Sequence, residues 1–171
     1  MSLPQRVAVS AGVLAIAIGA AIGLSAQPIP PGDHLTGTWI LNVPQSKYVP
    51  ADMAPKSGRS RITVTTEGIK VTTDGMNAKG EETHTEYTAK LDGKDYPWKG
   101  TVAGKPSTEQ DAVSWKKIDE WTYENTAKLK GKVLTVSHVV ISKDGKTRTN
   151  TVTGTNAQGQ TVNSVVKYDK Q

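Results

Sequence analysis

Polar and apolar residues alternate along most of the chain from Arg59 onward, in stretches that are rich in Thr and Val. A period of two residues is typical of β-strands that bury one face. Short turn signals separate these stretches, and most of them contain Gly, which supplies the positive φ that tight hairpins require. The signals are Glu67-Gly68, Lys79-Gly80, Asp92-Gly93, Asp119-Glu120, Lys130-Gly131, Asp144-Gly145 and Gln158-Gly159. The pattern therefore predicts long antiparallel strands joined by hairpin turns.

The predicted strands number about ten. They span residues 36–43, 59–66, 69–74, 81–91, 94–100, 111–118, 121–129, 132–142, 146–154 and 160–169. The segment 44–58 contains three prolines, so we expect a loop or at most one helical turn there, because proline removes backbone donors. The segment 101–110 is predicted to be a second loop.

The N-terminal segment has a different pattern. Arg6 precedes an uncharged, apolar run over residues 7–24, and the small residues Ser25 and Ala26 follow it. This order is typical of a secretory signal peptide. An uncleaved membrane anchor is the alternative, since the run is about as long as a bilayer is thick. The predicted organisation is a signal peptide at 1–26, an extended leader at 27–35 and a barrel domain at 36–171, in a periplasmic or secreted protein.

A sheet made of hairpins must protect its two edge strands, and closure into a barrel does so. We therefore expect an all-β fold with little helix, a single antiparallel up-and-down barrel of about eight to ten strands. Such a barrel has room inside for side chains and one small ligand. An outer-membrane barrel would need an apolar outer surface. One face of strand 81–91 instead carries Glu82, His84, Glu86 and Lys90, so we expect no integral membrane barrel.

Composition narrows the chemistry further. The chain has no Cys, which excludes disulfides, thiol nucleophiles and Cys-held metal sites, and its net charge of +5 is spread out rather than clustered. We therefore expect no nucleic-acid partner. Glu82 and Glu86 lie about 13 Å apart on one strand face, too far to share a metal with His84. His138 is interpreted as a core residue among apolar neighbours. Catalytic motifs are missing from the sequence, so we expect no enzyme, cofactor or metal.

The first predicted strand contains Gly37-Thr38-Trp39, and the last ends in Val165-Val166-Lys167-Tyr168-Asp169-Lys170. With the hairpin-linked strands, these motifs resemble the calycin superfamily, namely lipocalins, fatty-acid-binding proteins and avidins, and a group of uncharacterised exported bacterial proteins with a lipocalin-like barrel. The resemblance implies that Trp39 forms the barrel floor and that Tyr168 lies in the interior. Val166 stands where fatty-acid-binding proteins have an arginine, and Leu41 stands where avidins have their biotin-binding asparagine.

Alternation along the strands predicts which side chains face the interior. These are Trp39, Leu41, Val43, Ile62, Val64, Ile69, Val71, Tyr87, Ala89, Leu91, Tyr123, Ala127, Leu129, Val162, Val166 and Tyr168. Ligand-binding candidates among interior and rim residues are Tyr87, Tyr123, Arg148, Tyr168, Trp98 and Trp115. The tyrosine hydroxyls can equally bond to one another, to backbone or to water, and packing alone can explain the tryptophans. The direction of Arg148 depends on a one-residue choice of register.

Two hypotheses follow for function. The first is an exported, monomeric barrel that binds or carries a small, partly apolar or amphipathic molecule in its interior. The second is a barrel filled by its own side chains, whose loops 44–58 and 101–110 bind a protein or a component of the cell envelope.

Overall fold

Twelve strands form one antiparallel sheet in the computed structural model, which describes residues 32–171. The strands are β1 (Gly37–Leu41), β2 (Ser57–Thr65), β3 (Gly68–Met76), β4 (Glu82–Ala89), β5 (Tyr96–Pro97), β6 (Lys99–Val102), β7 (Lys105–Pro106), β8 (Ala112–Lys117), β9 (Thr122–Leu129), β10 (Lys132–Ile141), β11 (Thr147–Thr155) and β12 (Thr161–Lys170). Two short 3₁₀ helices, η1 (Val43–Gln45) and η2 (Ala51–Met53), lie between β1 and β2. The prediction of an all-β fold with little helix is confirmed. The expected signal peptide and most of the leader lie outside the described residues.

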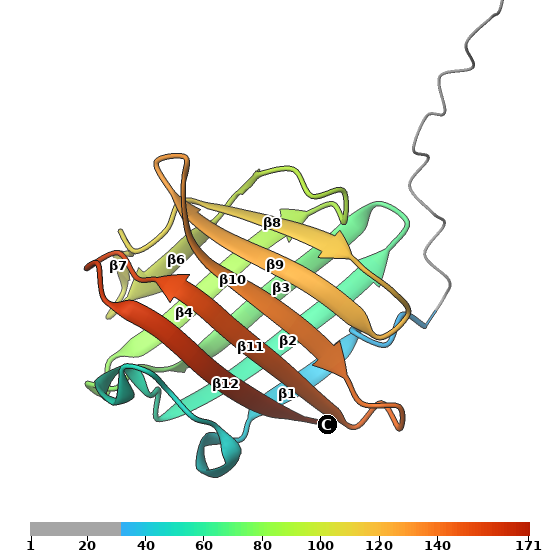
Figure 1. Cartoon of the computed structure of the whole chain (residues 1–171), viewed down its shortest axis with the longest axis horizontal. Coiled ribbons are helices and arrows are strands. Elements are labelled where there is room, and N and C mark those ends of the chain that lie inside the picture. The colour runs from blue at the N-terminus through green and yellow to red at the C-terminus, as the bar shows by residue number, and fades with distance from the viewer. Residues whose placement is uncertain (1–31) are drawn as a thin grey trace, which may run out of the picture.

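The sheet curls into a half-barrel. Its strand order is β5-β8-β9-β10-β11-β12-β1-β2-β3-β4-β6-β7, and β8–β12 lie in front of β1–β4 in Figure 1. The expectation of a closed barrel of eight to ten strands was wrong, because no hydrogen-bonded ladder within residues 32–171 joins the two ends of this order. The two ends nevertheless lie near each other, since β4 contacts β5 and β8.

The chain segment from β5 to β6 explains why the ladder stays open. Pro97 pairs with Ala112 of β8, whereas Lys99, two residues later, pairs with Glu86 of β4. The expected single strand 94–100 is therefore divided at Trp98, and each half pairs with a different edge. Trp98 covers Gly100 so closely that a Cβ there would lie 2.2 Å from its ring. The chain from β5 to β6 thus connects the two ends of the sheet covalently, where a closed barrel would have a hydrogen-bonded ladder.

The predicted turns are confirmed at the glycines. Positive φ is found in the turns at Gly68, Gly80, Gly93, Gly131, Gly145 and Gly159. The turn at Asp119-Glu120 has no glycine and is closed by the amides of Ile118 and Asp119, which both donate to the Thr122 carbonyl. Most strands begin and end within a few residues of the predicted bounds.

Gly68 and Gly93 offer a matched test of turn geometry. Both have positive φ, but a Cβ at Gly68 would lie 2.2 Å from the Ala89 carbonyl oxygen, whereas a Cβ at Gly93 would meet nothing within 4 Å. Gly93→Ala is expected to cost only the conformational strain, about 1 kcal/mol. Gly68→Ala is expected to cost about 2 kcal/mol because the backbone must also move. Equal urea midpoints for the two variants would contradict the larger loss of stability predicted for Gly68→Ala.

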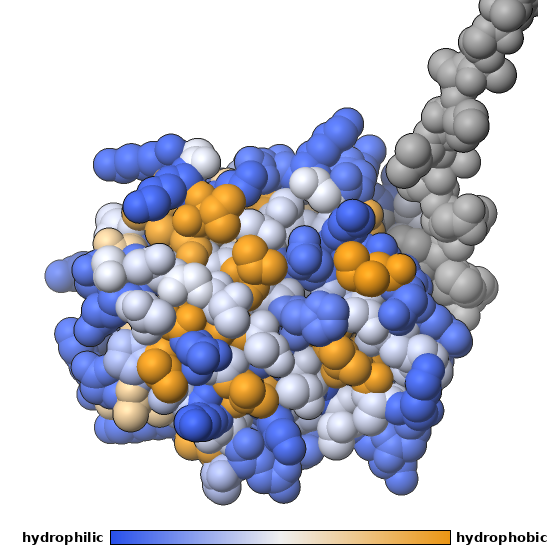
Figure 2. Space-filling view, viewed as in Figure 1, coloured by the Kyte–Doolittle hydropathy of each residue, from blue (hydrophilic) through white to orange (hydrophobic). Residues whose placement is uncertain are grey.

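The core lies on the concave side of the sheet. It contains Leu35, Trp39, Ile62, Ile69, Val71, Ala89, Val113, Trp115, Tyr123, Val139 and Ile141, all buried. The outer surface of β8–β12 is mostly polar with scattered apolar side chains, as Figure 2 shows. Val43 is not in the core as expected, because it begins η1 instead of continuing β1. Along the described residues, no helix is both long enough and apolar enough to cross a membrane.

The interpretation of His138 as a core residue was wrong. His138 is exposed and Val140 is 38% exposed, whereas Val139 and Ile141 are buried. A register shift between Val133 and Thr135 changes the pairing of β10 with β9. Because apolar residues occupy both faces of β10, alternation alone does not distinguish the inner face from the outer.

Candidate functional site

The interior face of the sheet changes character along its length. At one end, Trp39, Tyr123 and Val139 are completely buried, and Leu35 from the leader covers them. Beyond this end, the interior face carries small or polar side chains next to the apolar Val152 and Val166. They are Ser60, Thr73, Thr85, Asn125, Ser137 and Asn150. All but Ser60 remain partly exposed, so this part of the interior is in contact with solvent.

Arg148 lies on the interior face of β11, opposite Tyr168 of β12. The residue is 4% exposed, and its guanidinium carbon lies 3.9 Å from the centre of the Tyr168 ring and 5.4 Å from that of Trp39. No acidic side chain within residues 32–171 forms an ion pair with it, and its Nε is buried without a hydrogen-bond partner. Burial lowers the pKa of Arg148, and the neighbouring Tyr168 and Tyr87 oppose this. The guanidinium remains charged even so, because arginine is not deprotonated in proteins.

Tyr87 and Trp115 are brought together from β4 and β8. The Trp115 Nε1 donates to the Tyr87 hydroxyl at 3.1 Å. Burial raises the pKa of Tyr87 to about 12, partly offset by the Trp115 hydrogen bond and by Arg148. The Tyr87 hydroxyl is thus neutral and accepts one bond, and it keeps its own proton to donate.

Tyr48 and Asn150 complete this group, although the sequence did not single them out. Tyr48 follows η1 in a loop held against β12, where Lys47 pairs with Val165. The Tyr48 hydroxyl and Asn150 Oδ1 are both buried without a hydrogen-bond partner. Burial raises the pKa of Tyr48 to about 12, with a further contribution from Tyr168 that the nearby Ser46 hydroxyl partly offsets. We call Tyr48, Tyr87, Trp115, Arg148, Asn150 and Tyr168 the interior polar cluster.

Tyr123, another predicted ligand-binding residue, has a partner at the buried end. Its hydroxyl donates to Asp33 Oδ1 at 2.5 Å, while Lys117 Nζ donates to Asp33 Oδ2 at 2.7 Å. Burial and the bond to Asp33 raise the pKa of Tyr123. The Asp33 side chain is completely buried, so these contacts fix the leader to the sheet. Tyr123 is therefore held apart from the interior polar cluster.

Trp39 and Trp98 also have defined surroundings. The Trp39 Nε1 donates to the Leu35 carbonyl at 2.9 Å, and Lys170 Nζ lies 5.0 Å from the centre of the Trp39 ring. Trp98 lines a pocket of about 550 Å³ between β4, β6 and the segment 106–111. This pocket includes His84 and Glu86, which face outward, so Trp98 is not part of the interior polar cluster.

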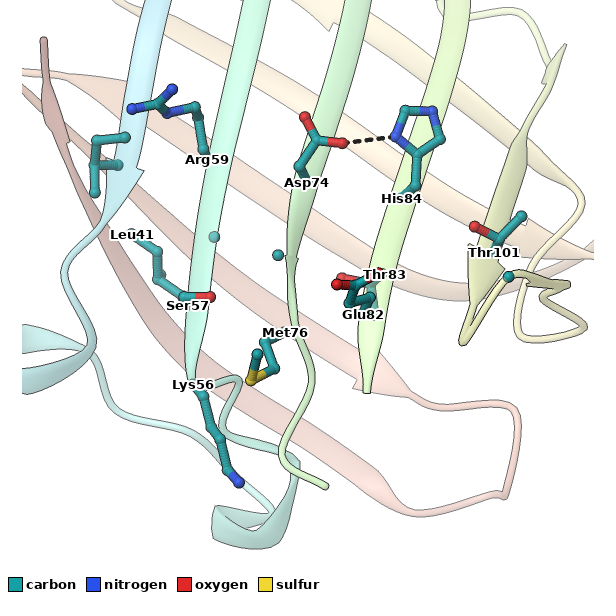
Figure 3. A pocket seen from close by; sticks show the side chains of 14 residues that line it. Leu41, Lys56, Ser57, Arg59, Asp74, Met76, Glu82, Thr83, His84 and Thr101 are labelled. Atoms are coloured by element: carbon teal, nitrogen blue, oxygen red, sulfur yellow. Dashed lines mark hydrogen bonds and ion pairs between the residues drawn. The ribbon is translucent and has the colours of Figure 1, made fainter. Parts of the chain in front are cut away.

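A second outer pocket, of about 630 Å³, lies over β1–β4 and β6 (Figure 3). Arg59, Asp74 and His84 are neighbours across adjacent strands, and His84 Nδ1 lies 2.7 Å from Asp74 Oδ1. The bond from His84 is the largest cause that lowers the pKa of Asp74. These side chains are about half exposed, and in the described part of the chain no group of three His, Asp or Glu residues is placed to hold a metal.

Comparisons of the chain with protein-family models, curated proteins and solved structures found no match.

Proposed function

We propose that this is an exported, calycin-like protein that binds a small, partly apolar molecule in the concave interior of its sheet. The observation that carries the proposal is the composition of the interior. An apolar floor at Trp39 adjoins small polar walls that contact solvent, and three buried polar atoms there have no partner: Tyr48 Oη, Arg148 Nε and Asn150 Oδ1.

Two physical arguments support interior binding. Buried polar groups are normally hydrogen-bonded, and unsatisfied ones cluster where a ligand or water supplies the missing partner. Small side chains such as Ser137 and Thr85 also occupy less of the space between two facing parts of a sheet than larger core residues do. The floor suits the apolar part of a ligand, and the interior polar cluster suits its polar part.

The loop-binding alternative has one observation in its favour. Pro106 at the end of β7, with Ser107 and Gln110 of the loop that follows it, forms one wall of the 550 Å³ outer pocket that Trp98 lines. A protein or envelope component bound by this loop would contact that pocket rather than the interior. Interior binding remains the better supported function, because the outer pocket contains no buried unsatisfied polar atom among the described residues.

The test is a titration with N-phenyl-1-naphthylamine, a neutral dye that fluoresces in apolar sites. We expect saturable binding to the wild-type protein. Ser137→Phe should weaken it at least tenfold, because the new ring occupies the interior. His138→Phe is the matched control, since it adds a similar ring to the outer face of the same strand, and it should bind as wild type does.

Circular dichroism confirms that both variants fold, and Ser137→Leu serves as a smaller substitution if Ser137→Phe does not. Failure of the dye to bind, or equal affinity in both folded variants, would contradict interior binding. Native mass spectrometry of protein from its own host gives a second readout. An excess mass that is lost on denaturation identifies a carried molecule by its mass.

A further inference from the structure

We infer that the molecule bound in the interior is an organic acid, and that Arg148 is the counter-ion of its anionic group. The inference rests on the proposed interior binding and adds the chemical class of the ligand. It starts from a charge in the interior that the described protein does not balance.

Two charged residues of the described chain are buried, Asp33 and Arg148, and only Asp33 has a partner of opposite charge. Asp33 receives an ion pair from Lys117 at 2.7 Å and a hydrogen bond from Tyr123. Arg148 has no carboxylate partner within residues 32–171, and its Nε has no acceptor. Buried charges are normally paired. The fold therefore meets this rule for Asp33 and leaves the anion at Arg148 to be supplied from outside.

The placement of the guanidinium suits such an anion. The guanidinium lies over the Tyr168 ring, with 3.9 Å between the guanidinium carbon and the ring centre. A guanidinium has five N–H donors at its edge, so it can contact a ring and still donate to an anion. A carboxylate or similar acid group accepts two parallel N–H bonds from this edge.

Neighbouring phenols provide further donors of the right kind. The Tyr87 hydroxyl accepts from Trp115 and keeps its proton, and the Tyr48 hydroxyl has no partner. Burial holds the pKa of both hydroxyls near 12, so both stay protonated at neutral pH. The ionisable groups of the interior polar cluster are thus one arginine and three phenols, with no carboxylate among them, which favours an anion over a cation.

Two dyes that differ in one group test the inference. 8-Anilinonaphthalene-1-sulfonate has the skeleton of N-phenyl-1-naphthylamine with an added sulfonate. We expect the anionic dye to bind the wild-type protein at least tenfold more tightly than the neutral one. Arg148→Met should remove this difference, because the sulfonate then lacks its counter-ion. Arg148→Lys should retain part of it.

The control is Arg61→Met, which removes an exposed arginine from the outer face of β2, where it pairs with Asp74. It should leave both affinities unchanged. If Arg148→Met folds and still prefers the anionic dye, the inference is overturned while neutral-dye binding keeps the proposed function. If neither dye binds the wild-type protein, the proposed function itself is overturned.

Discussion

Replacement of Trp39 by alanine is expected to lower the free energy of unfolding by about 3–5 kcal/mol, the usual range for a large buried aromatic side chain. Trp39 is completely buried, so its removal leaves a cavity at the buried end of the interior. It also removes the indole donor to the Leu35 carbonyl and the ring on which Arg148 and Lys170 rest. Urea denaturation followed by circular dichroism measures the change.

Trp121→Ala is the matched control for this prediction. Trp121 is also near the leader, with its ring stacked 3.5 Å from that of His34, but it is partly exposed. Because less apolar area is lost from the core, we expect a cost of about 1 kcal/mol. A Trp39→Ala variant no less stable than Trp121→Ala would show that Trp39 does not anchor the core.

Local features of this fold were predictable because they depend on few residues. Gly68, Gly131 and Gly145 take positive φ in tight turns, and glycine does so at little cost. Alternation of Thr and Val then locates the strands between the turns. Alternation along the first strand also predicted that Trp39 faces the interior, and the structure places it in the core.

Closure was not predictable because it depends on pairing between residues distant in sequence. A pattern of hairpins determines each local ladder but not what the first and last strands of the sheet contact. Here the division at Trp98 sends Pro97 to β8 and Lys99 to β4. Proline removes one donor from this segment, yet the sequence alone does not indicate that the two halves of the segment pair with different strands.

The candidate site was predictable only in part, for the same reason. Arg148 lies between Thr147 and Thr149, so polarity gives no sign of which face it occupies. Its cross-strand pairing with Tyr168 determines that it faces the interior. Tyr48 was missed because it lies in a proline-rich loop without periodicity, and only the docking of that loop on β12 brings it near Tyr168.

Asp33→Asn is expected to lower the free energy of unfolding by about 3 kcal/mol, the low end of the range for removing one partner from a buried ion pair. The Asp33 side chain is completely buried and accepts from Lys117, from Tyr123 and from the Leu35 amide. An asparagine keeps the shape but loses the charge, and its amide NH₂ replaces one of the two acceptor oxygens, so it meets the donor of either Lys117 or Tyr123. The low end applies because the Lys117 side chain is 26% exposed and can turn toward water.

A double-mutant cycle with Lys117→Met separates the ion pair from other effects, with a coupling of about 2 kcal/mol expected. The comparison pair is Lys70 and Glu86, 2.8 Å apart and about half exposed on the outer face. Glu86→Gln should leave the urea midpoint close to that of the wild type, because exposed ion pairs contribute little to stability. Additive effects of Asp33→Asn and Lys117→Met would mean that the ion pair between Asp33 and Lys117 does not help to hold the leader. In that case Asp33 would also be a buried charge without an effective counter-ion, and the contrast with Arg148 that indicates an anionic ligand would lose its force.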